Sequence, residues 1–185
     1  MTTSSLLIDA LRNRNQTISF CESLTAGLAT ATLASVPGAS DVLRGGLVTY
    51  ATDLKTALAG VEEAVIQECG AVSPTVAREM ARGCRKACGT DWAVALTGVA
   101  GPDLQDGHPV GEVWIGLSGP NWTASSLAAE LLPAEAGRYA LVPGSAEPLR
   151  VLTGERNEIR AAAVEAALLG ALRAIEREQT AGADR

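Results

Sequence analysis

The sequence predicts an α/β fold, a single three-layer α/β/α domain with a mixed, mostly parallel sheet. Amphipathic helical patterns alternate with short apolar strand patterns along the chain, which is typical of layered α/β domains. The chain has 185 residues, of which 47% are hydrophobic, enough for one sizeable core but crowded for two full domains. We therefore expect one domain over residues 1–178 and a flexible tail over residues 179–185.

The first part of the chain predicts two helix–strand units. The strands are short and buried, and the second helix has a small, alanine-rich surface that allows close packing on a sheet. In chain order the units are a helix over residues 5–14, a strand over 17–21, a helix over 25–35 and a strand over 46–50.

Three helices are expected next. A short helix can be capped by Thr52 or Asp53, and a second fits residues 62–68. The clearest helix has Ser73 as its N-cap and Pro74 at its first position, and it ends before a glycine. Its expected buried stripe consists of Val76, Met80, Ala81, Cys84 and Cys88.

The second half of the chain returns to strands. A continuous apolar strand over residues 92–96 leads into the turn 97–102, which holds two glycines and a proline. Residues 133–148, rich in Ala, Gly, Pro and Glu, are expected to be an insertion whose secondary structure the sequence does not predict. The remaining expected elements are strands over 112–117, 123–132 and 150–152 and a long amphipathic helix over 157–178.

Composition argues against several classes of protein. A net charge of −6 disfavours a nucleic-acid or anionic-membrane partner, because such partners require clustered Lys and Arg. The N-terminus has no cationic start, and no uncharged apolar run is long enough to span a bilayer. The four cysteines show neither C-x-x-C spacing nor a histidine set, so we expect reduced thiols and a cytoplasmic location.

Polar residues that can carry chemistry follow the predicted strands. Ser23 comes directly after one strand, Tyr50 and Lys55 follow another, and the turn 97–101 follows a third. Ligands of α/β sheets bind beyond the carboxyl ends of the strands, so these residues are expected to meet. Only two of the 15 basic residues are lysines, Lys55 and Lys86. Because a lysine can lose its proton and an arginine cannot, Lys55 is a candidate base for a Ser23 nucleophile.

Each of these residues also has an ordinary structural explanation. Ser23 can be a helix N-cap, Lys55 a solvated helix residue, and Tyr50 a core aromatic with an exposed hydroxyl. Glu22 can be a cap or a surface ion-pair partner. His108, the only histidine, lies in a polar stretch and is a poor candidate for a Ser-His-Asp triad. Spacing alone thus leaves an enzyme and a structural or binding protein about equally open.

Six short sequence blocks, spaced along the chain, favour the enzyme over the structural or binding protein. The chain resembles the CinA C-terminal family, which includes the nicotinamide-nucleotide amidases, in its stand-alone form. The resemblance covers roughly residues 5–176. Its blocks are Glu22-Ser23-Leu24-Thr25-Ala26-Gly27, Val48-Thr49-Tyr50 with Lys55, Gly70-Ala71-Val72-Ser73, Thr97-Gly98-Val99-Ala100-Gly101-Pro102, Pro109-Val110-Gly111-Glu112-Val113-Trp114 and Gly154-Glu155-Arg156-Asn157-Glu158-Ile159-Arg160.

The resemblance implies hydrolysis of the carboxamide of nicotinamide mononucleotide to nicotinate mononucleotide and ammonia, with no metal or redox cofactor. It implies Ser23 as nucleophile, Lys55 as base and Tyr50 as the accompanying hydroxyl. Arg156 is the candidate for the substrate phosphate, although it can equally pair with a neighbouring glutamate. A homodimer is expected by analogy. The substrate contacts implied are Glu22, Thr25, Gly27, Thr97, Gly98, Ala100, Gly101 and Arg156.

The chain also departs from the family pattern. Ala26 stands where the family usually has a second glycine, and Glu155 replaces an aspartate. The segment 133–148 is longer than the usual connection, so it can cover the site or alter substrate choice. Two alternatives therefore stay open, namely a binding or scaffold protein without turnover and an amidase or esterase for a different substrate.

Overall fold

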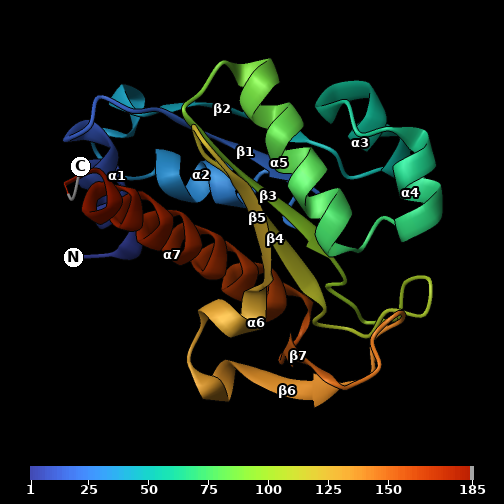
Figure 1. Cartoon of the computed structure of the whole chain (residues 1–185). Coiled ribbons are helices and arrows are strands. Elements are labelled where there is room, and N and C mark those ends of the chain that lie inside the picture. Colours follow the sequence, from blue (N-terminus) through green and yellow to red (C-terminus); the bar gives the residue numbers. More distant parts are fainter. Residues whose placement is uncertain (184–185) are drawn as a thin grey trace.

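A five-stranded sheet with helices on both faces forms the body of the molecule in the computed structural model, which describes residues 1–183 (Figure 1). The strand order is β2-β1-β3-β4-β5, in which β1 pairs parallel with β2 and β3, and β4 pairs antiparallel with β3 and β5. The predicted mixed, mostly parallel sheet is thus confirmed. The strands are β1 (Ile18–Glu22), β2 (Leu43–Val48), β3 (Trp92–Gly98), β4 (Val113–Ser118) and β5 (Thr123–Leu127).

Two helical layers cover the sheet. Helices α3, α4 and α5 lie on one face, and α1, α2 and α7 lie on the other (Figure 1). The helices are α1 (Thr3–Arg12), α2 (Leu28–Ala34), α3 (Thr52–Ala59), α4 (Glu63–Cys69), α5 (Pro74–Cys88), α6 (Ala128–Leu131) and α7 (Arg156–Ala183), with short 3₁₀ turns at Ala39–Asp41 and Ala134–Ala136. None of the described helices is long and apolar enough to cross a membrane.

Successive residues of the central strands point into two different cores. Phe20 and Val94 pack in the larger core beneath α1 and α7, whereas Cys21 and Ala95 pack in the smaller core beneath α5. This alternation follows from the two-residue repeat of a strand. Every residue of β3 is buried, as its continuous apolar sequence predicts for a central strand.

Helix α5 lies very close to the sheet because one strand residue lacks a side chain. A Cβ atom on Gly116 of β4 would lie 2.0 Å from the carbonyl oxygen of Ala77. The helix begins as predicted, since the Ser73 side chain accepts a hydrogen bond from the Val76 N–H and Pro74 is its first residue. Of the predicted buried stripe, Cys88 is only half-buried because the last turn reaches the surface.

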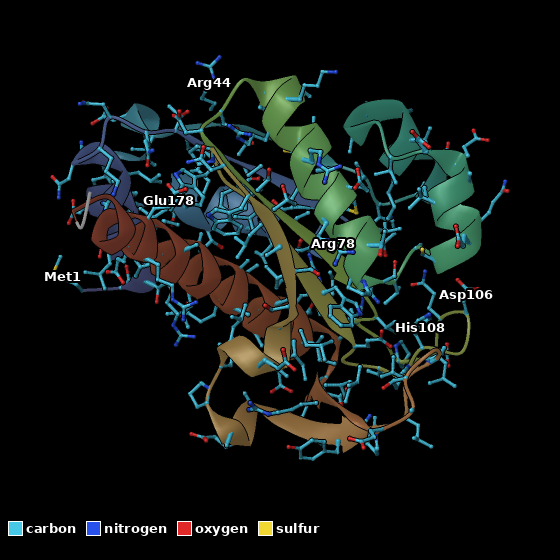
Figure 2. All side chains as sticks on the ribbon, viewed as in Figure 1. Met1, Arg44, Arg78, Asp106, His108 and Glu178 are labelled. Carbon is cyan, nitrogen blue, oxygen red and sulfur yellow. The ribbon has the colours of Figure 1, made fainter. Side chains whose placement is uncertain are left out.

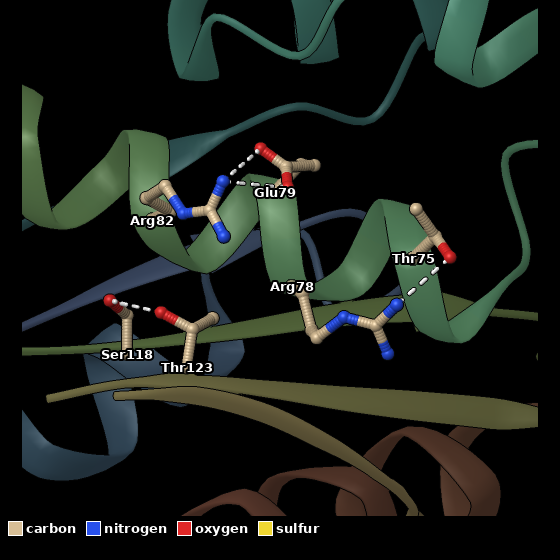
Figure 3. Close-up of polar contacts among 6 residues, drawn as sticks. All are labelled: Thr75, Arg78, Glu79, Arg82, Ser118 and Thr123. Atoms are coloured by element: carbon tan, nitrogen blue, oxygen red, sulfur yellow. Dashed lines mark hydrogen bonds and ion pairs between the residues drawn. The ribbon is translucent and has the colours of Figure 1, made fainter.

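Polar contacts fix α5 over the outer edge of the sheet. Arg78 donates hydrogen bonds to Thr75 and to Ser125 of β5, and Ser118 and Thr123 pair across β4 and β5. Figure 3 shows the contact of Arg78 with Thr75, the pair across the two strands, and a surface ion pair one turn further along α5. None of these residues lines the candidate cavity described below, and their contacts serve the packing of the layers.

Several predicted element boundaries are wrong. Helix α2 begins at Leu28 and not at residue 25, because Ala26 and Gly27 have φ values of +51° and +98°, which no helix continues. Strand β2 ends at Val48, so Tyr50 lies beyond it, and the N-cap of α3 is Ala51 and neither Thr52 nor Asp53.

The second half of the chain also differs from the expectation in two places. The predicted strand over residues 123–132 is only β5, since residues 128–131 form helix α6. The predicted strand at residues 150–152 is confirmed as part of β7 (Leu149–Leu152). It pairs with β6 (Gly137–Ala140) in a separate two-stranded sheet, which gives part of the expected insertion a hairpin structure.

The last helix is longer than its pattern predicts. Helix α7 runs to Ala183, beyond the expected end at residue 178. Residues 184–185 of the predicted tail lie outside the described residues.

Candidate functional site

Three strand ends bring the predicted site residues together. Because β1, β2 and β3 are parallel, their carboxyl ends lie at one edge of the sheet. A cavity of about 340 Å³ opens there, within the range of small-molecule sites. Its lining is formed by Ser23, Leu24, Tyr50, Thr52, Lys55, Ala71, Val72, the segment 97–105 and Arg156.

Ser23 and Lys55 are in direct contact inside this cavity. Lys55 Nζ lies 3.1 Å from Ser23 Oγ and 3.0 Å from the carbonyl oxygen of Thr49. Ser23 is 9% exposed and Lys55 is 2% exposed, although Lys55 has no ion-pair partner within 4 Å among the described residues. An unpaired buried ammonium is unfavourable, and such a lysine tends towards its neutral form.

Burial lowers the pKa of Lys55 below its ordinary value of 10.5. The fields of Cys21 and Asp53 oppose this change, but burial is the larger effect. A neutral amine at hydrogen-bond distance from a serine hydroxyl can accept its proton. The geometry and the direction of the pKa shift therefore agree with the role predicted for Lys55.

Tyr50 and Arg156 meet at the mouth of the cavity. Arg156 Nη2 donates a hydrogen bond to the Tyr50 hydroxyl at 3.0 Å, and Nη1 donates to the carbonyl oxygen of Gly101. Tyr50 is 55% exposed. No hydrogen bond joins Tyr50 to Ser23 or Lys55 in the described part of the chain, so the structure does not place Tyr50 on the nucleophile.

The turn after Ser23 is anchored by Glu22. The Glu22 side chain is fully buried and accepts hydrogen bonds from the backbone N–H groups of Gly27, Ala29 and Thr30 at 2.8–2.9 Å, and from the Thr30 hydroxyl at 2.7 Å. Carboxylates at a helix N-terminus satisfy its free N–H groups and its dipole. Glu22 therefore holds the first turn of α2, and its carboxylate does not line the cavity.

Two other predicted substrate contacts also lie off the cavity lining. Gly27 adopts the left-handed conformation that ends the turn, and Thr25 is fully buried with a hydroxyl that has no hydrogen-bond partner among the described residues. Both residues shape the turn around Ser23. The structure therefore gives Glu22, Thr25 and Gly27 supporting positions rather than contact positions.

The turn after β3 forms the opposite wall. Thr97, Gly98, Ala100 and Gly101 all line the cavity, as predicted. The Thr97 hydroxyl is already engaged, since it donates to the carbonyl oxygen of Ala71 at 2.8 Å. The hydroxyl proton of Thr97 is thus not available to a ligand in the cavity.

Three buried backbone amides close to Ser23 or in the turn after β3 have no hydrogen-bond partner among the described residues. Within residues 1–183, no hydrogen bond uses the N–H of Leu24, Thr25 or Ala100, although these residues are at most 5% exposed. Leu24 and Ala100 line the cavity. Buried N–H groups are almost always paired, so such groups beside a nucleophile point to an external acceptor.

Sequence reasoning missed two features of the site. The cavity wall extends through Asp103, Leu104 and Gln105, and Arg160 contacts the turn after Ser23. The signal for Arg160 was its spacing of four residues from Arg156, which places both on one face of a helix.

His108 has a different role from that of a catalytic triad. It lies on the loop after β3, where Figure 2 labels it beside Asp106. Its Nδ1 is 2.8 Å from a carboxylate oxygen of the buried Glu112, and it does not line the cavity. Among the described residues, no group of three or more His, Cys, Asp or Glu side chains could hold a metal ion.

Comparison with known proteins identifies relatives of the chain. A competence-damage inducible protein of Levilactobacillus brevis is 47% identical over 115 residues, which cover 62% of this chain and 28% of the relative. One from Listeria monocytogenes is 46% identical over the same length. The chain therefore matches only about 28% of the length of these curated relatives.

Solved structures share the fold over nearly the whole chain. A CinA superfamily protein of Klebsiella pneumoniae has a TM-score of 0.79 at 24% identity, covering 96% of this chain and 99% of that protein. A competence/damage inducible protein of Agrobacterium tumefaciens has a TM-score of 0.76 at 28% identity, covering 94% and 95%. The family model of the CinA C-terminal domain matches residues 1–131, and the chain belongs to this family.

Proposed function

We propose that this protein is an amidase in which Ser23 is the nucleophile and Lys55 its general base. The observation that carries the proposal is the distance of 3.1 Å between Lys55 Nζ and Ser23 Oγ inside a cavity. Ser23 is a poor nucleophile without a base, and no other ionisable side chain is hydrogen-bonded to it among the described residues. The unpaired N–H groups of Leu24 and Ala100 support the proposal, because hydrolysis of an amide develops a negative oxygen.

The reaction begins when Ser23 Oγ attacks the carboxamide carbon and its proton passes to Lys55 Nζ. The carbonyl oxygen becomes an oxyanion, which the N–H groups of Leu24 and Ala100 stabilise. The residue after the nucleophile supplies one such N–H in other hydrolases with a serine on a strand-to-helix turn. Lys55 then protonates the leaving nitrogen, ammonia departs, and an acyl-serine remains.

Water then hydrolyses the acyl-serine, and Lys55 again transfers the proton. Lys55 removes a proton from the water molecule that attacks the acyl carbon, and it returns that proton to Ser23 Oγ as the acyl group leaves as a carboxylic acid. The acid loses its proton to solvent at neutral pH. Thr49 holds Lys55 throughout through its carbonyl oxygen, which accepts a hydrogen bond at 3.0 Å.

The substrate we propose is nicotinamide mononucleotide, with nicotinate mononucleotide and ammonia as products. The support is the resemblance to the nicotinamide-nucleotide amidases and the position of Arg156. This arginine lies at the mouth of the cavity and is exposed, so its guanidinium is available to a phosphate.

The test is ammonia release from nicotinamide mononucleotide by the purified protein. Turnover that disappears in both Ser23→Ala and Lys55→Ala supports the proposal. Folded wild-type protein without turnover contradicts the proposed substrate.

A second candidate function is hydrolysis of a different carboxamide. It is favoured by the part of the wall formed by Asp103, Leu104 and Gln105, which adds a carboxylate and a large apolar side chain at the cavity. A panel of carboxamides with and without a nucleotide phosphate separates the two candidates, because only the first function requires the phosphate.

A further inference from the structure

Arg160 joins the last helix to the turn that carries the nucleophile. Its Nε donates a hydrogen bond to the carbonyl oxygen of Leu24 at 3.1 Å, and its Nη2 donates to the carbonyl oxygen of Thr25 at 2.9 Å. A third bond from Nη1 to Asn157, also on α7, fixes the guanidinium plane. Arg160 forms no ion pair with a carboxylate among the described residues, so its charge is directed at two backbone carbonyls.

The peptide unit between Leu24 and Thr25 depends on this arginine. The Thr25 N–H has no hydrogen-bond partner in residues 1–183, and the Leu24 carbonyl accepts only from Arg160. The peptide bond is trans, so its C=O and N–H point in opposite directions. Arg160 therefore supplies the one hydrogen bond that sets the rotation of this peptide plane.

The rest of the turn is held by other groups. Ser23 N–H donates to Leu96 of β3 at 2.9 Å, and Ser23 C=O accepts from Ala26 at 3.1 Å. Glu22 holds the amides at the start of α2. The Leu24–Thr25 plane is thus the weakly held part of the turn, and it directly follows the Ser23–Leu24 plane that carries the Leu24 N–H. Leu24 lines the cavity.

The position of Arg160 also connects it to the mouth of the site. Arg156 and Arg160 are one helical turn apart on α7, and they contact the two sides of the cavity, Arg156 through Tyr50 and Gly101 and Arg160 through the nucleophile turn. The first two turns of α7 therefore link the turn after Ser23 to Tyr50 and Gly101 at the mouth of the cavity.

We propose that Arg160 is a positioning residue for the reaction, which holds the turn after Ser23 so that the Leu24 N–H meets the developing oxyanion. This inference rests on the proposed serine–lysine chemistry. A group that orients an oxyanion donor acts mainly in the transition state, so its loss lowers kcat more than it changes KM.

The experiment compares Arg160→Ala and Arg160→Lys with Arg173→Ala as the matched control. Arg173 lies on the same helix and also donates to a backbone carbonyl, that of Leu131 at 3.0 Å, but it is not in the cavity. We expect Arg160→Ala to lower kcat for nicotinamide mononucleotide about 100-fold, with KM changed less than about threefold. Arg160→Lys should restore little, because an ammonium cannot span two carbonyls as a planar guanidinium does.

Chemical rescue separates positioning from folding. Ethylguanidinium added to Arg160→Ala should recover part of kcat, and it should leave Arg173→Ala unchanged. If Arg160→Ala keeps kcat within about threefold of the wild type, or if its loss matches a fall in thermal stability and ethylguanidinium recovers nothing, the positioning role is overturned.

A second readout does not depend on the substrate. An alkyl fluorophosphonate reacts with an activated serine, whose oxygen forms the new P–O bond while fluoride leaves and the serine proton passes to the base. The P=O oxygen takes the place of the oxyanion. If the wild type labels Ser23 but does not hydrolyse the mononucleotide, the substrate proposal fails while slower labelling of Arg160→Ala still supports the inference. Wild-type protein that labels no Ser23 overturns both.

Discussion

Arg156 Nη2 donates a hydrogen bond to the hydroxyl of Tyr50 at 3.0 Å. The sequence suggested separate roles for these residues, a phosphate ligand and a hydroxyl beside the nucleophile. In the structure they form one contact at the mouth of the cavity, and Tyr50 is 55% exposed. Tyr50 is therefore better placed to orient Arg156 than to activate Ser23.

Replacing Arg156 should weaken binding of a phosphorylated substrate selectively. A charge-assisted contact contributes about 1.5–3 kcal/mol, so Arg156→Ala should raise KM for nicotinamide mononucleotide about 10- to 100-fold. KM for nicotinamide riboside, which lacks the phosphate, should change far less. Steady-state kinetics on both compounds measure the difference, and equal effects on the two would remove Arg156 as the phosphate ligand.

Tyr50→Phe tests the same contact from the other side. Loss of the hydroxyl frees one guanidinium nitrogen but leaves the ring, so we expect KM to rise less than about tenfold with kcat nearly unchanged. A fall in kcat comparable to that of Ser23→Ala would instead show that the Tyr50 hydroxyl takes part in catalysis. The kcat and KM values of the variant decide between these roles.

Lys55→Arg should abolish turnover although it keeps the positive charge. A guanidinium does not lose its proton, so Ser23 has no base, and the expected loss in kcat is at least about 10²- to 10⁴-fold. Ammonia release measures the activity, and circular dichroism shows whether the variant is folded. Lys86→Arg is the control, because this lysine is exposed in the last turn of α5 and does not line the cavity. An active Lys55→Arg protein would exclude Lys55 as the base.

The pH profile of kcat/KM should report the pKa of Lys55. Burial places this pKa below 10.5, and only the neutral amine acts as a base. The rate should therefore rise about tenfold per pH unit on the acidic side and level off above the pKa of Lys55. A profile that is flat from pH 6 to pH 10 would contradict the general-base role.

The same shift has a consequence for stability. In the unfolded chain the pKa of Lys55 returns towards 10.5, so the unfolded state binds more protons between the lowered pKa and 10.5. The free energy of unfolding contributed by Lys55 should increase as pH rises through this window. Urea unfolding of the wild type and of Lys55→Met, compared across this pH range, isolates the contribution. A constant difference between the two proteins would show that the pKa is unshifted.

The sequence predicted the layered fold and the meeting of Ser23 with Lys55 because both depend on local patterns. Apolar strands followed by polar residues are visible in the sequence, and parallel strands bring their ends together. The pairing of Arg160 with the Leu24 carbonyl joins residues 136 positions apart, and no local pattern encodes it. The predicted start of α2 was wrong because a positive φ at Ala26 is unusual for a residue with a Cβ atom, and the sequence gives no sign of it.

Glu22 should matter for stability more than for substrate binding. Its carboxylate accepts four buried or partly buried hydrogen bonds, and Glu22→Ala leaves three backbone N–H groups without their acceptor. We expect a loss of about 3 kcal/mol or more in the free energy of unfolding. Glu79→Ala, which removes only a surface ion pair with Arg82, should cost less than about 1 kcal/mol. Urea denaturation measures both, and equal losses would show that the Glu22 contacts are not stabilising.

Ala26 makes the turn around the nucleophile less stable than a glycine would. Its φ of +51° is in the left-handed region, where an L-residue with a Cβ atom is about 1–2 kcal/mol less favourable. Glycine adopts this conformation freely but loses about 0.5–1 kcal/mol more entropy on folding. Ala26→Gly should therefore raise the free energy of unfolding by roughly 0.5–1 kcal/mol.

The control for Ala26 is an exposed alanine in the helix that follows. Ala31 lies in α2, where a glycine has only its entropic disadvantage, so Ala31→Gly should lower stability by about 1 kcal/mol. Opposite signs for the two substitutions, measured by urea denaturation, would identify backbone strain at Ala26. If Ala26→Gly destabilises the protein as much as Ala31→Gly does, Glu22 and Arg160 hold the turn firmly enough that the alanine carries no strain. In that case the family glycine at this position serves access to Ser23, and the variant should change kcat/KM even though it lowers stability.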